Sequence, residues 1–379
     1  MKNSKALIAA TLVFIGCLCV GFWIARHRPL WNDEYYSQVS SIHGTSYADQ
    51  FSGHIAEGGN APLFYALQKS FLQLVHYQVP SPWLEGHWSN DASSQILLRI
   101  NPIIFMSLSV ALVFYYFCRR YSLGTAFLSL FIYFSSYMLW AYWAEARPYA
   151  LMVFLTTVQS VVFLEGGPWE TLAGTNILLG LTSILSLGEI LAVSALWWAF
   201  KDRDWKKYIA LTLLPAMITL FYYAQAPKYP FFFGDLSPEQ LIRDNISRQQ
   251  FDILFIFLIS LAAYFWGQKV RMPKDAPGEE ILKPVTYVIF MALVLASTAV
   301  VLFLFTLHTK TGQFPITSRY FIYLTPIGVM AATMLIVSLY KSLSKHRLMQ
   351  LIFTGLVGLL LAQHFLKIVP KAIHSLAGG

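Results

Sequence analysis

The sequence predicts an all-α polytopic membrane protein with about eleven transmembrane helices and an external cap of interfacial helices. Hydrophobic residues make up 56% of the 379 residues and charged residues 12%, which is about half the charged share of soluble domains. Several apolar runs approach the length that crosses a bilayer as a helix. We therefore expect one membrane-embedded domain over residues 1–379, including an external cap loop at 26–95, and no separate soluble domain.

The first apolar run, Ala6–Ala25, carries no charge and as a helix of about 1.5 Å per residue would span roughly 30 Å. Asp33 and Glu34 follow it closely, among tryptophan and tyrosine residues that favour a membrane interface. Neighbouring side chains on a helix point about 100° apart, so we expect the two carboxylates to have different roles. The alternative is a solvated loop edge that only carries charge.

A mixed polar and apolar segment continues from Arg26 to about Gln95. Pro62 suits the first turn of a helix that runs to about Tyr77. The expected apolar face of this helix contains Leu63, Leu67, Ser70, Phe71, Leu74 and Val75. A helix of this pattern is typical of one that lies along the membrane interface.

The remaining apolar runs give the rest of the bundle. The run at 171–200 is too long for one straight helix, and Gly188 and Glu189 interrupt it, so we expect two short or broken helices that meet near one surface. The other expected spans lie near residues 96–117, 123–140, 150–164, 208–223, 251–266, 284–307, 320–340 and 348–365.

The net charge of +8 does not indicate nucleic-acid binding. The basic residues form short clusters between apolar runs, whereas a nucleic-acid surface needs a continuous basic stripe. Because basic clusters favour the inner side of a membrane, we expect the N-terminus inside. The acidic pair and the segments 145–147, 224–250 and 308–319 then share the outer side.

The side chains expected on that outer side suit one kind of chemistry. Carboxylates can act as general bases on hydroxyl groups, and arginines such as Arg147 and Arg319 can hold a phosphate with paired hydrogen bonds. Aromatic rings suit sugar rings and isoprenoid chains. An enzyme that takes a sugar from a lipid phosphate would need these three groups. Alternatively, Glu145 and Arg147 are interface residues that reach toward water from an apolar surface.

Five short motifs in this order resemble those of the GT-C glycosyltransferases, in the branch of protein O-mannosyltransferases and of bacterial aminoarabinose- and lipopolysaccharide-modifying transferases. The resemblance covers roughly Ala6 to Pro326. The motifs are Asp33-Glu34, Asn60-Ala61-Pro62-Leu63-Phe64-Tyr65, Leu98-Arg99-Ile100-Asn101-Pro102, Glu145-Ala146-Arg147-Pro148-Tyr149-Ala150-Leu151 and Ser318-Arg319-Tyr320.

This resemblance implies an enzyme that moves a sugar from a polyprenyl-phosphate donor to a hydroxyl of a lipid, glycan or protein acceptor in the cell envelope. It implies a bacterial cytoplasmic (inner) membrane, with the active site outside. It assigns the catalytic positions to Asp33, as general base, and to Glu34. Arg147 and Arg319 are expected to approach each other and share the lipid phosphate. The expected substrate-binding residues are Glu57, Asn60, Tyr65, Glu145, Arg147, Tyr149, Arg319 and Tyr320.

Two departures from the family pattern affect the cofactor and the acceptor. Asn60-Ala61-Pro62 stands where members of this branch often carry His-Pro-Pro, so the role of that histidine is vacant or moved. No cofactor is required by the resemblance, and a divalent metal ion is left open. Without an external soluble domain, the acceptor would be small or membrane-embedded, or a partner protein would recognise it.

Two other classes of protein remain as alternatives. A flippase or transporter for a lipid-linked saccharide would also need many spans and arginines near phosphates, but its polar groups should line a path through the bilayer. A non-catalytic subunit would retain the fold without the reaction, which the missing histidine permits.

Overall fold

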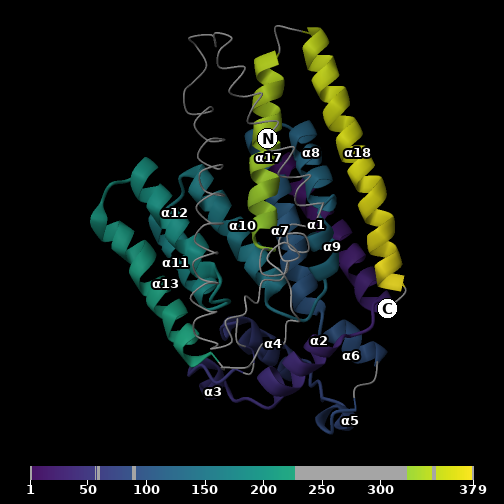
Figure 1. Cartoon of the computed structure of the whole chain (residues 1–379), viewed down its shortest axis with the longest axis vertical. Coiled ribbons are helices and arrows are strands. Elements are labelled where there is room, and N and C mark those ends of the chain that lie inside the picture. The colour runs from purple at the N-terminus through teal and green to yellow at the C-terminus, as the bar shows by residue number, and fades with distance from the viewer. Residues whose placement is uncertain are drawn as a thin grey trace, which may run out of the picture.

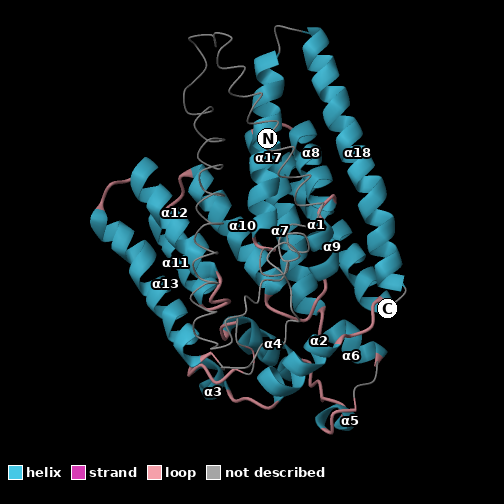
Figure 2. Cartoon of the chain, viewed as in Figure 1, coloured by secondary structure: helices cyan, strands magenta, loops and turns pink. Residues whose placement is uncertain are grey.

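The computed structural model of the chain is a bundle of helices with a layer of short helices at one end (Figures 1 and 2). It describes residues 2–55, 57, 60–87, 91–226, 322–343 and 347–377. Within these ranges the regular structure is helical apart from an isolated antiparallel bridge between Asn60 and Ser183. The predicted all-helical class is therefore confirmed for the described residues.

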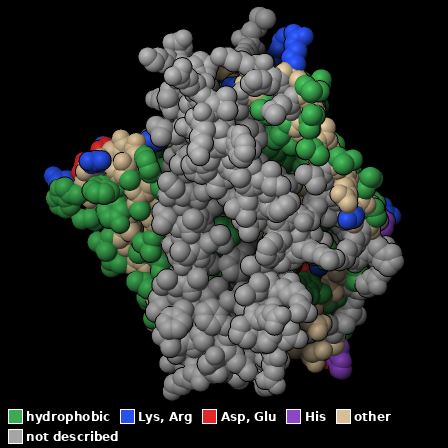
Figure 3. Space-filling view, turned by 45° about the horizontal axis from the view of Figure 1, so that its top comes forward, with side chains coloured by type: hydrophobic (Ala, Val, Ile, Leu, Met, Phe, Trp, Pro, Cys, Tyr) green, Lys and Arg blue, Asp and Glu red, His purple; other side chains and the backbone are tan. Residues whose placement is uncertain are grey.

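Four helices of the described part are long and apolar enough to cross a membrane, which supports the predicted membrane protein. They are Asn3–His27, Ala92–Arg120, Trp205–Gln225 and Gln350–Lys367. Figure 3 shows hydrophobic side chains along the outward face of the α11–α13 arm, with charged side chains at one end of it. The count of about eleven spans remains a prediction, and the spans expected at 251–266 and 284–307 lie outside the described residues.

The central helix of the bundle is α7 (Ile100–Arg120), which packs against α1 (Lys2–His27), α8 (Leu123–Phe134) and α10 (Tyr149–Glu165). An arm of three helices adjoins α10: α11 (Trp169–Gly180), α12 (Ser186–Phe200) and α13 (Trp205–Gln225). Two later helices, α17 (Leu324–Ser342) and α18 (Arg347–Ala377), cover α8 and the short helix α9 (Tyr137–Tyr142).

Two of the predicted spans are divided. The span predicted at 96–117 divides at Leu98 and Arg99. There the Gln68 side chain donates to the Leu98 carbonyl (Nε2–O, 2.9 Å), and the Arg99 side chain donates to the Ala25 carbonyl near the end of α1. The span predicted at 123–140 stops at Phe134, because the Ser135 hydroxyl donates to the carbonyl of Ile132 (2.7 Å) and competes with helix continuation. The run at 171–200 is divided as predicted, by the turn at 181–185 between α11 and α12, but Gly188 and Glu189, which were expected to interrupt it, lie inside α12.

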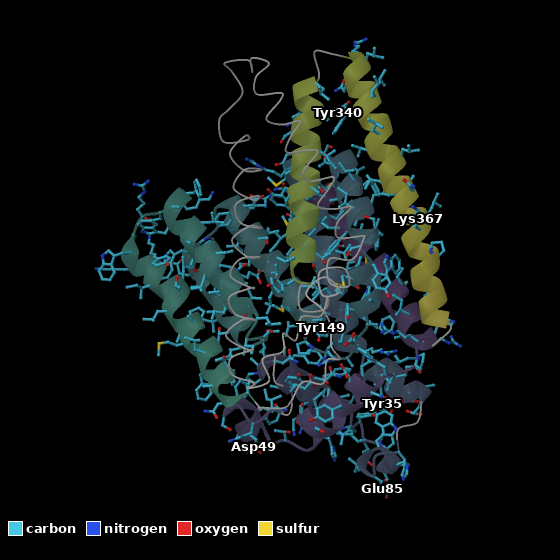
Figure 4. All side chains as sticks on the ribbon, viewed as in Figure 1. Tyr35, Asp49, Glu85, Tyr149, Tyr340 and Lys367 are labelled. Carbon is cyan, nitrogen blue, oxygen red and sulfur yellow. The ribbon has the colours of Figure 1, made fainter. Side chains whose placement is uncertain are left out.

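The short helices at one end form a layer that we call the cap. It consists of α2 (Asn32–Tyr36), the π-helix η1 (Ser37–His43), α3 (Tyr47–Phe51), α4 (Leu63–Leu74), α5 (Ser81–Leu84) and α6 (Ala92–Leu97). Figure 4 shows Tyr35, Asp49 and Glu85 at this end of the molecule and Tyr340 at the opposite end.

The apolar face expected for α4 is turned outward at Leu67, Leu74 and Val75, which are 40%, 78% and 40% exposed. That this helix lies along the membrane interface stays a prediction. The side chains that are buried instead are Phe64, Tyr65, Ala66, Gln68 and Leu72. Gln68 belongs inside because it bridges the Leu98 carbonyl and the Asn101 side chain (2.9 and 2.8 Å), and these bonds compensate for burying its amide.

The end of the bundle opposite the cap carries basic residues. Lys341 lies over the ring of Tyr121 (5.8 Å), the residue that follows Arg119 and Arg120 in the sequence. Lys201 lies over the ring of Phe163 (6.0 Å). The 21 residues of α7, about 30 Å at 1.5 Å per residue, separate these groups from the cap. Arg119 and the acidic pair are thus at opposite ends of α7.

Candidate functional site

The two adjacent carboxylates of α2 point in different directions. The Glu34 carboxylate accepts from the backbone N–H of Trp31 (Oε2–N, 3.2 Å) and so caps the start of the helix. Its side chain is completely buried, whereas the side chain of the adjacent Asp33 is 37% exposed. The single turn of α2 therefore presents one carboxylate to the outside and holds the other inside.

Arg147 gathers carboxylates from three separate segments. Its Nη1 donates to Asp33 Oδ2 (2.6 Å) and its Nη2 donates to Glu57 Oε2 (2.5 Å). Glu145 Oε1 lies 4.0 Å from Nη1. We call Asp33, Glu57, Glu145 and Arg147 the Arg147 cluster. The sequence predicted each of these residues as part of the site, and the structure brings the four together.

Burial decides between two interpretations of the segment 145–147. Burial alone lowers the pKa of Arg147, but the neighbouring carboxylates, led by Glu57, hold this pKa well above its usual range. The side chains of Arg147 and Glu145 are almost fully enclosed. The alternative that both residues reach out into water at an interface is therefore wrong. Arg147 stays cationic because its charge is matched inside the protein.

Glu57 is a hydrogen-bond hub inside the cap. Its carboxylate accepts from the Ser37 hydroxyl and from Asn60 Nδ2 (3.0 Å) as well as from Arg147. The same Asn60 nitrogen is 2.9 Å from the Tyr65 hydroxyl. Burial, followed by the negative charge of Glu57, raises the pKa of Tyr65 well above its ordinary value. The substrate contacts expected of Glu57, Asn60 and Tyr65 stay predictions, and the structure shows these residues bound to one another.

The turn between α11 and α12 fixes the segment that carries Asn60. Asn60 forms the isolated bridge with Ser183. The backbone N–H groups of Ala61 and Leu63 donate to the carbonyls of Thr182 and Leu181 (3.1 and 2.8 Å). The broken helix pair predicted at 171–200 thus has a purpose in the fold, since its turn supports the start of α4.

Tyr149 lies beside Arg147, where α10 begins. The guanidinium carbon of Arg147 is 5.3 Å from the centre of the Tyr149 ring, within the range of a cation–π contact. The ring of Tyr142 makes an edge contact with the ring of Tyr149 (5.2 Å between ring centres). Figure 4 shows Tyr149 between the bundle and the cap.

Arg99 is a further residue of the site. It belongs to the motif Leu98-Arg99-Ile100-Asn101-Pro102, but the sequence alone indicated no role for it. Its Nε and Nη2 donate to the two oxygens of Glu34 (2.9 and 2.5 Å). Glu34 Oε1 also accepts from the backbone N–H of Ala146 (2.8 Å). A single arginine at the start of an apolar run is a usable signal, because a cation there needs a carboxylate partner.

Two expected site residues, Arg319 and Tyr320, lie outside the described residues, so the predicted approach of Arg319 to Arg147 stays a prediction. Within the described ranges no group of three or more His, Cys, Asp or Glu side chains is arranged to hold a metal ion. The sequence matches no protein-family model and no curated protein at a significant level.

Proposed function

We propose that this protein is a membrane glycosyltransferase that moves a sugar from a polyprenyl-phosphate donor to an acceptor hydroxyl. One observation carries this proposal. Of the four carboxylates gathered between α2 and the segment 145–147 in the described structure, Asp33 has the exposed side chain, while those of Glu34, Glu57 and Glu145 are enclosed. Asp33 is therefore the carboxylate that an acceptor can reach.

Asp33 acts as the general base in this proposal. Its carboxylate takes the proton of the acceptor hydroxyl while the acceptor oxygen forms a bond to the anomeric carbon of the sugar. The bond between that carbon and the phosphate oxygen breaks, and the phosphate leaves with the electron pair. The hydrogen bond from Arg147 holds the Asp33 carboxylate in one place (2.6 Å), which favours a defined line of attack.

The departing phosphate needs cations more than it needs a proton donor. We expect Arg319 to supply one such contact. Arg147 uses two of its five N–H donors on Asp33 and Glu57, so we expect its remaining N–H groups to supply a second contact to the phosphate. A cation shared between base and phosphate would keep the two reacting ends close together.

The proposed reaction takes place at the external face of a bacterial inner membrane. The support for this is the separation of the cap, with its carboxylates, from the basic residues at the other end of the bundle, since basic clusters favour the cytoplasmic side. The partners are a polyprenyl-phosphate-linked sugar, a lipid, glycan or protein acceptor, and the surrounding membrane lipid.

The test is an assay on the purified protein in vesicles that contain polyprenyl phosphate carrying a radiolabelled sugar, with a bacterial envelope extract as the source of acceptors. The proposed function requires the label to leave the polyprenyl carrier. Label that crosses the bilayer while still attached to its carrier would identify a flippase instead. Neither transfer nor movement with any sugar of a panel would indicate a subunit that has kept the fold without the reaction.

A further inference from the structure

We infer that Arg99 is a positioning residue of this site, which sets the geometry of the Asp33–Arg147 pair through Glu34. The inference rests on the proposed function for its catalytic consequence. Its structural basis is independent of that function, because it depends only on the hydrogen bonds between α1, α2, α7 and the segment 145–147.

Every N–H group of the Arg99 guanidinium has an acceptor. Its Nε and one Nη2 hydrogen are directed at Glu34, and the other Nη2 hydrogen at the carbonyl of Pro29 (2.9 Å). The two hydrogens of Nη1 are directed at the carbonyls of Ala25 (3.4 Å) and Arg28. An arginine has five such donors, so none is left for a substrate. The residue is also only 1% exposed, which excludes a direct contact with the donor or the acceptor.

Glu34 links Arg99 to the segments that carry Asp33 and Arg147. Besides Arg99, its carboxylate accepts from the backbone N–H groups of Trp31 (3.2 Å) and Ala146 (2.8 Å). Ala146 directly precedes Arg147, and Glu34 directly follows Asp33. The buried bond from Ala146 to Glu34 therefore runs beside the more exposed bond from Arg147 to Asp33. A shift of the inner bond displaces the outer one, because each pair of partners is joined by a single peptide unit.

Lysine cannot replace Arg99 in this arrangement. An ammonium group has three donors and no planar fork, so Arg99→Lys retains the charge but loses contact with part of the Glu34 carboxylate or of the α1 carbonyls. The charge near the site stays the same in this variant, and the geometry changes. That makes it a direct test of positioning.

The first measurement compares the transfer kinetics of Arg99→Lys with those of Lys69→Met in the full-length protein. Lys69 is the matched control, because its ammonium also donates to backbone carbonyls within the cap, those of Ile42 (3.0 Å) and Thr45 (2.5 Å), without touching the Arg147 cluster. For Arg99→Lys we expect kcat to fall by about 10-fold or more with the KM for the donor within about twofold of wild type. For Lys69→Met we expect a kcat within about twofold of wild type.

The second measurement needs no activity. Asp33→Ala and Arg147→Met, each of which removes the contact, are combined in a double-mutant cycle, and their melting temperatures in detergent are measured in the wild-type and Arg99→Lys backgrounds. Because the two residues are in contact, their effects should be non-additive in the wild-type background. With the pair displaced by Arg99→Lys, the effects should become additive.

The two measurements fail in different ways. A non-additivity that is unchanged in the Arg99→Lys background would overturn the positioning role, as would a kcat that falls no further in Arg99→Lys than in Lys69→Met. Absence of transfer by the wild-type protein would overturn the proposed function alone, since the cycle would still decide whether Arg99 sets the geometry of the pair.

Discussion

The substitution Asp33→Asn separates catalysis from stability at this site. Asparagine has nearly the same shape, and its side-chain oxygen can still accept the hydrogen bond from Arg147 that Asp33 accepts at 2.6 Å. It cannot take a proton from an acceptor hydroxyl. The variant therefore removes the proposed base and leaves the surrounding contacts in place.

The two expected effects differ in size. The Asp33 side chain is 37% exposed, so solvent screening limits its ion pair with Arg147 to about 1 kcal/mol or less of folding free energy. Glu57 continues to hold the guanidinium from its other side (2.5 Å). Loss of a general base costs about 100-fold or more in rate, and a factor of 100 corresponds to about 2.7 kcal/mol in activation free energy.

The assay follows transfer of labelled sugar from its polyprenyl carrier at saturating donor, together with thermal unfolding of the same preparation. We expect kcat to fall by about 100-fold or more, donor binding to survive, and the melting temperature to change little. Near-normal transfer by Asp33→Asn would refute Asp33 as the base. A large fall in melting temperature would instead refute the weak, solvent-screened ion pair that the structure indicates.

Three further predictions concern the residues around this carboxylate. Arg147→Lys should lower transfer about 10-fold and unfolding free energy by about 1.5–3 kcal/mol, since one ammonium cannot serve both Asp33 and the buried Glu57; transfer kinetics and thermal unfolding measure both. Glu34→Gln should lower kcat less than Asp33→Asn but destabilise more, by about 3–5 kcal/mol in chemical denaturation, because it leaves a buried guanidinium without its counter-ion. Burial raises the pKa of Tyr77 to about 12. The contribution of the neutral Tyr77 side chain to folding stability should therefore be present below pH 10 and be lost as the pH rises toward 12. Tyrosinate absorbance should follow this loss, and Tyr77→Phe should remove it.

The sequence predicted the helical class and much of the site because both depend on local signals. Apolar runs of the right length give α1, α7 and α13, and the length of the run at 171–200 predicts its division into α11 and α12, although the break precedes Gly188. The acidic pair and the segment 145–147 were recognisable as short motifs. Asp33, Glu145 and Arg147 from these motifs meet in the structure. Glu57, from the mixed segment after the acidic pair, joins them.

What the sequence could not predict depends on tertiary contacts. The apolar pattern of α4 does not reveal that Gln68 is needed inside, because its amide is satisfied only when Leu98 and Asn101 arrive from α7 and the turn before it. The role of Arg99 is hidden for the same reason, since its acceptors come from the end of α1 and from α2, about 65 to 74 positions earlier in the chain. Partner identity at such separations is a property of the folded state.

The position of Asp33 at the outer edge of the Arg147 cluster has a consequence for energy coupling. In the proposed reaction the proton taken from the acceptor has a direct way into bulk water, since the Asp33 side chain is itself exposed. The enclosed carboxylates of Glu34, Glu57 and Glu145 are not needed as a relay. No charge then has to move through the depth of the bilayer during turnover. Transfer should accordingly proceed at the same rate in vesicles with and without a membrane potential, which distinguishes this chemistry from ion-driven transport.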